Sequence, residues 1–174
     1  MRNFLGALII ILSLLSSCKF SGNKPNDILT KLKSDKIRLD SLLMNTTNYI
    51  QDQSAMSFKT VKDYHDSLIL IQESPISESG DWSLKLTHYF TQKGETFAFQ
   101  KELNFFNSVC VPGIAREKEI IFFDSNFKQI ERYYRLSDER DNTLTNDSCL
   151  QYKPNYQIFK NRDQYLTNKK LTLR

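Results

Sequence analysis

The sequence WSLKLTHYFTQKGETFAFQKELNF, residues 82–105, carries the clearest structural pattern in the chain. Apolar or aromatic side chains alternate with polar ones over residues 82–90, and the apolar alternation continues over residues 97–105. A period of two residues is typical of a half-buried β-strand, and Lys93-Gly94 supplies a turn between the two runs. The stretch therefore predicts an antiparallel hairpin.

A second hairpin is predicted after the break at Val111-Pro112-Gly113. Its strands are residues 119–123 and 127–136, joined by a tight turn at Asp124-Ser125-Asn126, where asparagine tolerates a positive φ. Three further elements are predicted: a buried strand at Leu68–Ile71, a final strand near Leu150–Phe159 and a short basic helix at Asn161–Lys169.

Residues 27–50 predict an amphipathic helix that Asn26 or Asp27 can cap, because leucine and isoleucine recur mostly at intervals of three, four or seven. Lys36 interrupts this apolar stripe, which disfavours a long coiled coil and favours packing on a sheet. Residues 51–62 fit either a loop or a second short helix. Together these elements predict an α+β fold, with an N-terminal amphipathic helix packed on an antiparallel β-meander of five or six strands.

The N-terminus has the profile of an export signal. A positive start is followed by an apolar run at residues 4–15, shorter than the roughly 20 residues that a membrane-spanning helix needs. The sequence Leu15-Ser16-Ser17-Cys18 then resembles the lipobox of bacterial lipoproteins. That resemblance implies that residues 1–17 are removed and that Cys18 is acylated. An ordinary secretory signal or a short membrane anchor is the alternative.

Acylation of Cys18 would make membrane lipid a partner of the mature chain, since two or more acyl chains hold a domain on a bilayer. Lys19 stands where an aspartate retains lipoproteins in the inner membrane of enteric bacteria, so the resemblance implies an envelope protein of the outer membrane. Residues 18–25 are predicted to be a tether, and residues 26–174 a single domain. The mature chain has 23 basic and 20 acidic side chains, a balance that gives no argument for a nucleic acid partner.

Two cysteines remain besides Cys18. In an exported protein, Cys110 and Cys149 most simply form a disulfide. The alternative is a catalytic thiolate with His88 or His65 as its base.

Motifs for catalysis, metals or cofactors are lacking in the sequence. His88 lies between apolar neighbours on its predicted strand and fits a core position, whereas His65 fits an exposed turn. Two histidines are too few for a typical zinc site, and the acidic loop at residues 138–147 lacks the spacing of a calcium loop. The isolated glycines cannot form a phosphate-binding loop. We expect no metal, no cofactor and no catalytic residues.

Aromatic residues make up 12% of the chain and are concentrated in the predicted sheet. Tyr89, Phe106 and Tyr133 should point away from the main apolar face of their strands, as a docking surface would. The leading hypothesis is a non-enzymatic, lipid-anchored binding module whose partner is an envelope protein or a glycan. The alternatives are a small envelope hydrolase that uses His65 or His88, and a carrier of a small apolar ligand. The basic residues near the C-terminus offer a contact for anionic lipid or polysaccharide.

Overall fold

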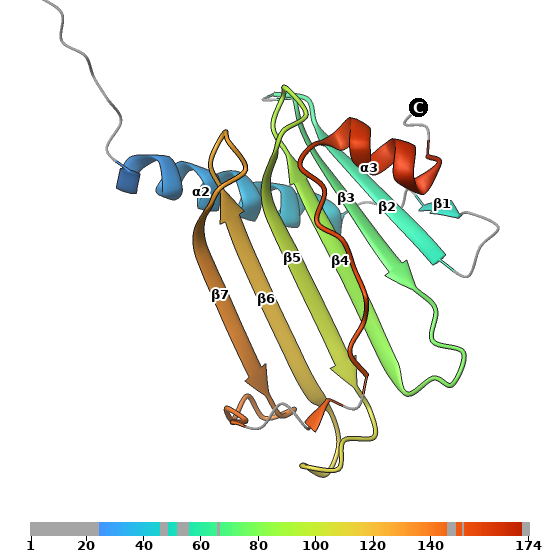
Figure 1. Ribbon diagram of the computed structural model, residues 1–174. Coiled ribbons are helices and arrows are strands. Elements are labelled where there is room, and N and C mark those ends of the chain that lie inside the picture. Colours follow the sequence, from blue (N-terminus) through green and yellow to red (C-terminus); the bar gives the residue numbers. More distant parts are fainter. Residues whose placement is uncertain are drawn as a thin grey trace, which may run out of the picture.

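An antiparallel sheet forms the body of the protein, as a computed structural model shows (Figure 1). The structure describes residues 25–45, 49–51, 56–65, 67–145, 149–150 and 152–171. Seven strands lie side by side in chain order, which makes the sheet a simple meander. The strands are β1 (Tyr49–Gln51), β2 (Met56–Asp63), β3 (Leu68–Pro75), β4 (Trp82–Phe90), β5 (Thr96–Phe105), β6 (Ala115–Phe123) and β7 (Gln129–Ser137), and the helices are α2 (Pro25–Met44) and α3 (Arg162–Lys169).

The predicted α+β fold with an antiparallel sheet is confirmed, and the three-residue β1 adds a seventh strand to six longer ones. The first predicted hairpin corresponds to β4 and β5, with Trp82 opposite Phe105. The second corresponds to β6 and β7. In its turn the residue with positive φ is Phe127, at 64°, and not Asn126 as predicted. The Asp124 carboxylate shapes this turn, because its Oδ1 accepts the backbone N–H groups of Asn126 and Lys128.

The predicted secondary structure was wrong for the segments before and after β1. The helix ends at Met44 instead of continuing to Ile50, which lies in β1. Residues 56–63 form β2, although the sequence suggested a loop or a helix. Polar residues fill most positions of β2, and its buried Phe58 and Val61 pack on opposite faces of the sheet, so neither face shows a clear apolar alternation.

The predicted last strand is not a strand. Residues 152–159 run across the face of the sheet in front of β4 and β5 without forming a ladder (Figure 1). Tyr152, Tyr156 and Ile158 pack toward the sheet. Lys153, Asn155 and Gln157 are exposed, so burial alternates without strand pairing. The predicted C-terminal helix is confirmed as α3, and the Asn161 side chain caps it by accepting the N–H of Gln164.

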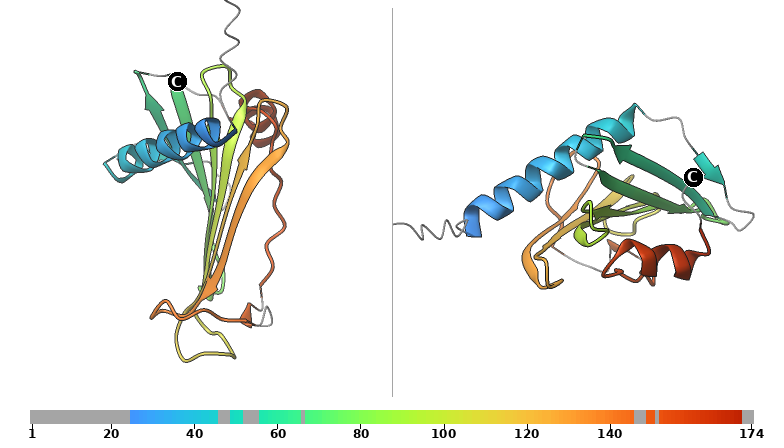
Figure 2. Two further views of the ribbon diagram at one scale, coloured as in Figure 1. Left: turned by 90° about the vertical axis from the view of Figure 1, so that its left-hand side faces the viewer. Right: turned by 90° about the horizontal axis from the view of Figure 1, so that it is seen from above.

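The two faces of the sheet are covered differently (Figure 2). Residues 152–159 and α3 lie along one face, where the larger part of the apolar core is buried. On the opposite face α2 crosses one end of the strands and contacts β2, β3 and β5. Leu39 of α2 packs there against Leu70 and Tyr89. Among the described residues no helix lies over the other half of that face, which leaves strand surface open there.

Lys36 interrupts the stripe of α2 as expected, yet it is buried against the sheet. Its Nζ lies 2.7 Å from the Asp40 carboxylate and 4.8 Å from the centre of the Tyr89 ring. Burial lowers the pKa of Lys36, although the hydrogen bond to Asp40 opposes that shift. The Tyr89 hydroxyl donates to the other oxygen of Asp40 at 2.6 Å. The contact between helix and sheet is therefore partly polar, and its polar groups are paired.

Within the described residues, neither helix is long and apolar enough to cross a membrane.

Candidate functional site: a groove on the uncovered half of the sheet

A surface depression of about 740 Å³ lies on the α2 side of the sheet, on the half that the helix leaves open. Strands β5, β6 and β7 form its floor. We refer to it as the sheet groove. The side chains that matter for its chemistry are Glu102, Phe106, Arg116, Lys118, Tyr133 and Arg135.

Strand register places these side chains in rows across the groove. In the middle row Lys118 of β6 lies between Glu102 of β5 and Arg135 of β7. In the row nearer the loops Arg116 lies between two neutral residues, Asn104 and Ser137. Opposite residues of antiparallel strands point to the same face, so each row presents its side chains together.

The charged groups of the groove differ in how they are paired. Lys118 Nζ lies 3.1 Å from Glu102 Oε1. Arg135 donates to the backbone oxygen of Asp141 at 2.6 Å and lies 3.9 Å from its carboxylate. Arg116 is exposed and has no ion pair or hydrogen bond to another of the described residues. The groove therefore holds one guanidinium that is available to an anionic group.

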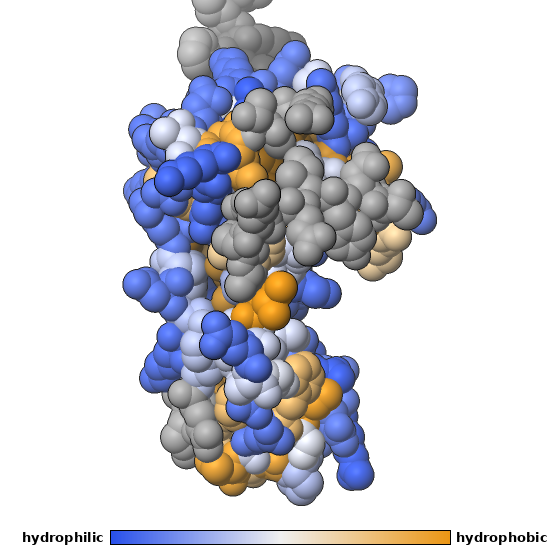
Figure 3. Space-filling view, turned by 90° about the vertical axis from the view of Figure 1, so that its right-hand side faces the viewer, coloured by the Kyte–Doolittle hydropathy of each residue, from blue (hydrophilic) through white to orange (hydrophobic). Residues whose placement is uncertain are grey.

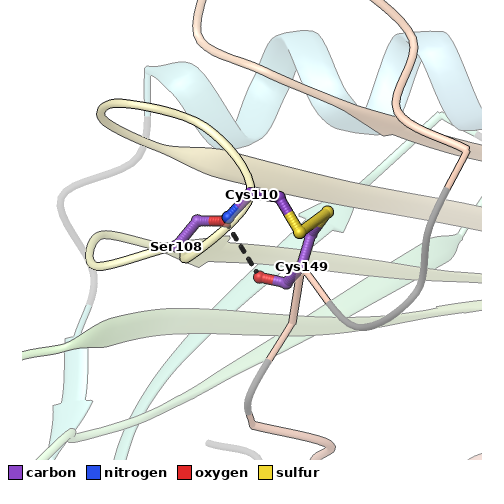
Figure 4. The surroundings of a disulfide bond; sticks show 3 residues. All are labelled: Ser108, Cys110 and Cys149. Atoms are coloured by element: carbon purple, nitrogen blue, oxygen red, sulfur yellow. Dashed lines mark hydrogen bonds between the residues drawn. A yellow bond between two sulfur atoms is a disulfide. The ribbon is translucent and has the colours of Figure 1, made fainter.

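A disulfide joins the two loops at the lower end of the groove (Figure 4). The sulfur atoms of Cys110 and Cys149 lie at bonding distance, with their Cα atoms 5.1 Å apart, so the structure agrees with the predicted pair. The Ser108 hydroxyl accepts the N–H of Cys110 and donates to the carbonyl oxygen of Cys149. The loop after β5 and the segment that follows β7 are thereby held together.

A close contact between the same two segments adds to this bond. Gly113 has a φ of +96°, and a Cβ atom at this position would lie 2.8 Å from Glu139 Oε2. Positive φ and this short distance both favour glycine. The lower rim of the groove is thus built from two segments that fit closely.

The three residues predicted to form a docking surface differ in how exposed they are. Phe106 and Tyr133 are 39% and 45% exposed and both line the groove. Tyr89 points to the same face, as predicted, but it is buried beneath α2, so its assignment to an exposed surface was wrong. The sequence alone did not identify Arg116, Lys118 or Arg135. Arg116 and Lys118 alternate with buried residues of β6, but β7 shows no such alternation around Arg135. An alternating pattern also does not separate a binding face from a solvated one.

His88 lies in the core, as the sequence suggested. It is fully buried, and its Nε2 accepts the backbone N–H of Phe159 at 3.3 Å. Burial, with a smaller contribution from the Lys169 ammonium, lowers the pKa of His88 to about 3. The imidazole is therefore neutral at pH 7 and holds the C-terminal segment on the sheet.

His65 lies in the exposed turn between β2 and β3, where its backbone N–H donates to Asp63. That carboxylate is also 2.9 Å from Arg38. The two histidines belong to different parts of the fold, and the structure does not bring them together with either cysteine.

A second charged cluster is buried on the face opposite the groove. Lys101 lies 2.7 Å from Glu117 and 3.8 Å from Glu119. Glu119 also binds Arg132 at 2.7 Å and accepts the Tyr156 hydroxyl at 2.9 Å. Because residues 152–159 cover this cluster, its charged groups bind one another and stabilise the sheet.

An apolar surface also occurs at the lower end of the molecule, seen from the side of β2 in Figure 3. Ile76 and Val109, in two loops at that end, are 56% and 72% exposed. Both residues lie outside the groove, so the charged side chains of the groove are not part of this apolar surface.

Among the residues that the structure describes, no three His, Cys, Asp or Glu side chains are grouped so that they could hold a metal ion. Cys18, the predicted lipidation site, lies outside the described residues. Neither a family model, nor a curated protein, nor a solved structure matches this chain.

Proposed function

We propose that the chain is a lipid-anchored, non-enzymatic binding module of the cell envelope and that it binds its partner through the sheet groove. The observation that carries this proposal is the half-covered sheet face, where exposed Phe106 and Tyr133 lie beside Arg116, which has no ionic partner among the described residues. Aromatic and arginine side chains are enriched among residues that dominate binding energies. The groove supplies both within one concave surface.

Membrane attachment through Cys18 would set the position of this surface. Helix α2 begins beside β7, so the point at which a tether would join the described domain is on the groove's side of the sheet (Figure 1). Pro25 is seven positions after Cys18, and an extended chain over seven positions spans at most about 25 Å. An anchored domain would therefore hold the groove close to the membrane. Lys19 supports the outer membrane as the location.

The arrangement of the histidines favours binding over hydrolysis. A general base needs contact with its substrate, but the His88 imidazole is fully buried and bonded to backbone. The apolar carrier is also less well supported, because Leu39, Leu70 and their neighbours fill the space between α2 and the sheet.

Site-specific photo-crosslinking in intact cells tests the groove. A photoreactive amino acid at Tyr133 should give an adduct of higher mass, whereas the same amino acid at Tyr64, which is 82% exposed in the turn after β2, should not. Equal yields at the two positions would remove the groove as the binding surface.

The anchor is tested separately by Cys18→Ser. We expect this substitution to move the protein from the membrane fraction to the soluble fraction and to remove the mass of the acyl groups. Unchanged fractionation and mass would contradict lipidation at this cysteine.

A further inference from the structure

We propose that the ligand of the sheet groove is an acidic polysaccharide whose sugar carboxylate binds Arg116. This inference rests on the proposed function and names the class of partner. Four properties of the groove support it: its length, its net charge, the position of its aromatic rings and the character of its polar groups.

The groove suits an elongated ligand. Tyr133 is level with Gln100 across the sheet, six residues along β5 from Phe106. At about 3.3 Å per residue, the two aromatic side chains mark positions about 20 Å apart along the strands. A single sugar ring or amino acid would reach one end only, whereas a chain of several sugar units can contact both.

The charge of this surface complements an anion. Arg116, Lys118 and Arg135 line the groove together with two acidic side chains that bind them, Glu102 and Asp141. Glu117 also borders the groove, but its carboxylate binds Lys101 on the opposite face of the sheet. Of these three cations, Arg116 is the one that has no ionic partner in the described part of the chain. A guanidinium can bind a carboxylate through two parallel hydrogen bonds, which also fixes the orientation of the ligand.

An additional cation lies at the margin of the groove. Lys85 of β4 is exposed and opposite Glu102 in the strand register. With Lys85 this part of the sheet face holds two more positive than negative charges, which would attract an anionic chain before contact.

The remaining side chains suit sugar rings and hydroxyl groups. The faces of Phe106 and Tyr133 offer apolar surfaces on which the C–H faces of sugar rings can lie. Between them stand Glu102 as an acceptor and Asn104 as both donor and acceptor. A hydroxyl group also donates and accepts, so it can bind such a mixed surface without leaving a partner unsatisfied.

A polypeptide ligand is less well served by this surface. An extended peptide gains most of its binding energy by pairing its backbone with the edge of a sheet. The groove lies on the sheet face, where the backbone groups of β5 and β6 are already paired with neighbouring strands. The outer edge of β7 has no further strand beside it among the described residues, but Arg116, Phe106 and Tyr133 line the sheet face. A ligand that contacts these three residues therefore binds side chains and not that edge.

Calorimetric titration of the full mature protein in detergent provides the test. The probes are polygalacturonate, alginate and hyaluronate, which carry carboxylates on different sugar backbones. Methyl-esterified polygalacturonate keeps the sugar chain without the charge, dextran sulfate presents sulfate on a sugar chain without carboxylate, and polyglutamate presents carboxylates on a polypeptide.

We expect at least one of the three carboxylated polysaccharides to bind. Arg116→Gln should weaken that binding about tenfold or more, as loss of a charge-assisted pair does. Lys128→Gln removes the same charge from the turn at the opposite end of β7 and should change the affinity less than about twofold. Near-ultraviolet circular dichroism of both variants checks that the fold is retained.

Several results would overturn the inference. These are no binding by any carboxylated polysaccharide, equal binding of the methyl ester, tighter binding of dextran sulfate or polyglutamate, or equal losses in the two variants. Cross-linking at Tyr133 without polysaccharide binding would refute the acidic polysaccharide as the ligand and leave the groove as the proposed binding surface. Equal cross-linking at Tyr133 and Tyr64 would discard the groove itself.

Discussion

Replacing both cysteines of the disulfide by alanine should lower the free energy of unfolding by about 4 kcal/mol. Cys110 and Cys149 are separated by 39 positions in the sequence. In the chain-entropy model, closing a loop of this length removes about 13 cal/mol/K from the unfolded chain, or about 4 kcal/mol at 25 °C. The change in packing of the folded state is a smaller effect, because alanine still fills most of the space of a buried cysteine side chain.

Urea unfolding of the mature chain with Cys18→Ser, which removes the lipid, measures this effect. With a denaturant dependence of about 2 kcal/mol/M, the midpoint should fall by about 2 M in the double variant. The reduced protein with both cysteines present is the matched control and should unfold at the same urea concentration as the double variant. A loss below about 1 kcal/mol would refute the reasoning, since the bond would then constrain the unfolded chain very little.

Three further predictions concern buried polar groups and use the same unfolding assay. His88 takes up a proton near pH 6.5 in the unfolded chain but only near pH 3 in the folded protein. The contribution of the neutral imidazole to the free energy of unfolding is therefore complete above pH 6.5 and is lost as the pH falls toward 3. Between pH 7 and pH 5 the wild type should lose about 2 kcal/mol more than His88→Gln, and equal losses would show that His88 is not buried as described. Lys101→Met should cost about 3–5 kcal/mol because Glu117 stays buried without its cation, although Glu119 keeps Arg132. The same change at Lys118, whose side chain is exposed, should cost under about 0.5 kcal/mol. Tyr89→Phe removes the hydrogen bond to Asp40 and should cost about 2 kcal/mol, and a cost near zero would exclude a buried bond there.

The two hairpins could be predicted because their periodicity is local. In β4 the residues Leu84, Leu86 and His88 recur at every second position, so one strand contains enough information to fix its own faces. The segment before β3 carries no such signal. It becomes β2 because both its faces are covered, by α2 and by the C-terminal segment, and that coverage is a property of the whole fold.

Tyr89 and Tyr133 show why the candidate site could be predicted only in part. Both were expected to point away from the main apolar face, and both lie on the α2 side of the sheet. The difference between them is where α2 crosses. Tyr89 lies under the helix and donates to Asp40, whereas Tyr133 lies beyond it and stays 45% exposed. The alternation of a strand assigns a side chain to a face, but only tertiary packing determines whether that face is covered.

The two ends of the groove are stabilised by different interactions. At the upper end α2 is held by its apolar contacts and by an ion pair between Lys33 and Glu131 of β7, 2.7 Å long. At the lower end the loops that carry Phe106 and Asp141 are joined by the disulfide. A surface ion pair contributes little, so the upper end depends on core packing, which forms with the fold itself. The lower end depends on a covalent bond that persists in oxidising compartments. If the chain is exported and the groove binds as proposed, the lower end is fixed only once the disulfide has formed, and a reduced chain should retain the sheet but bind more weakly.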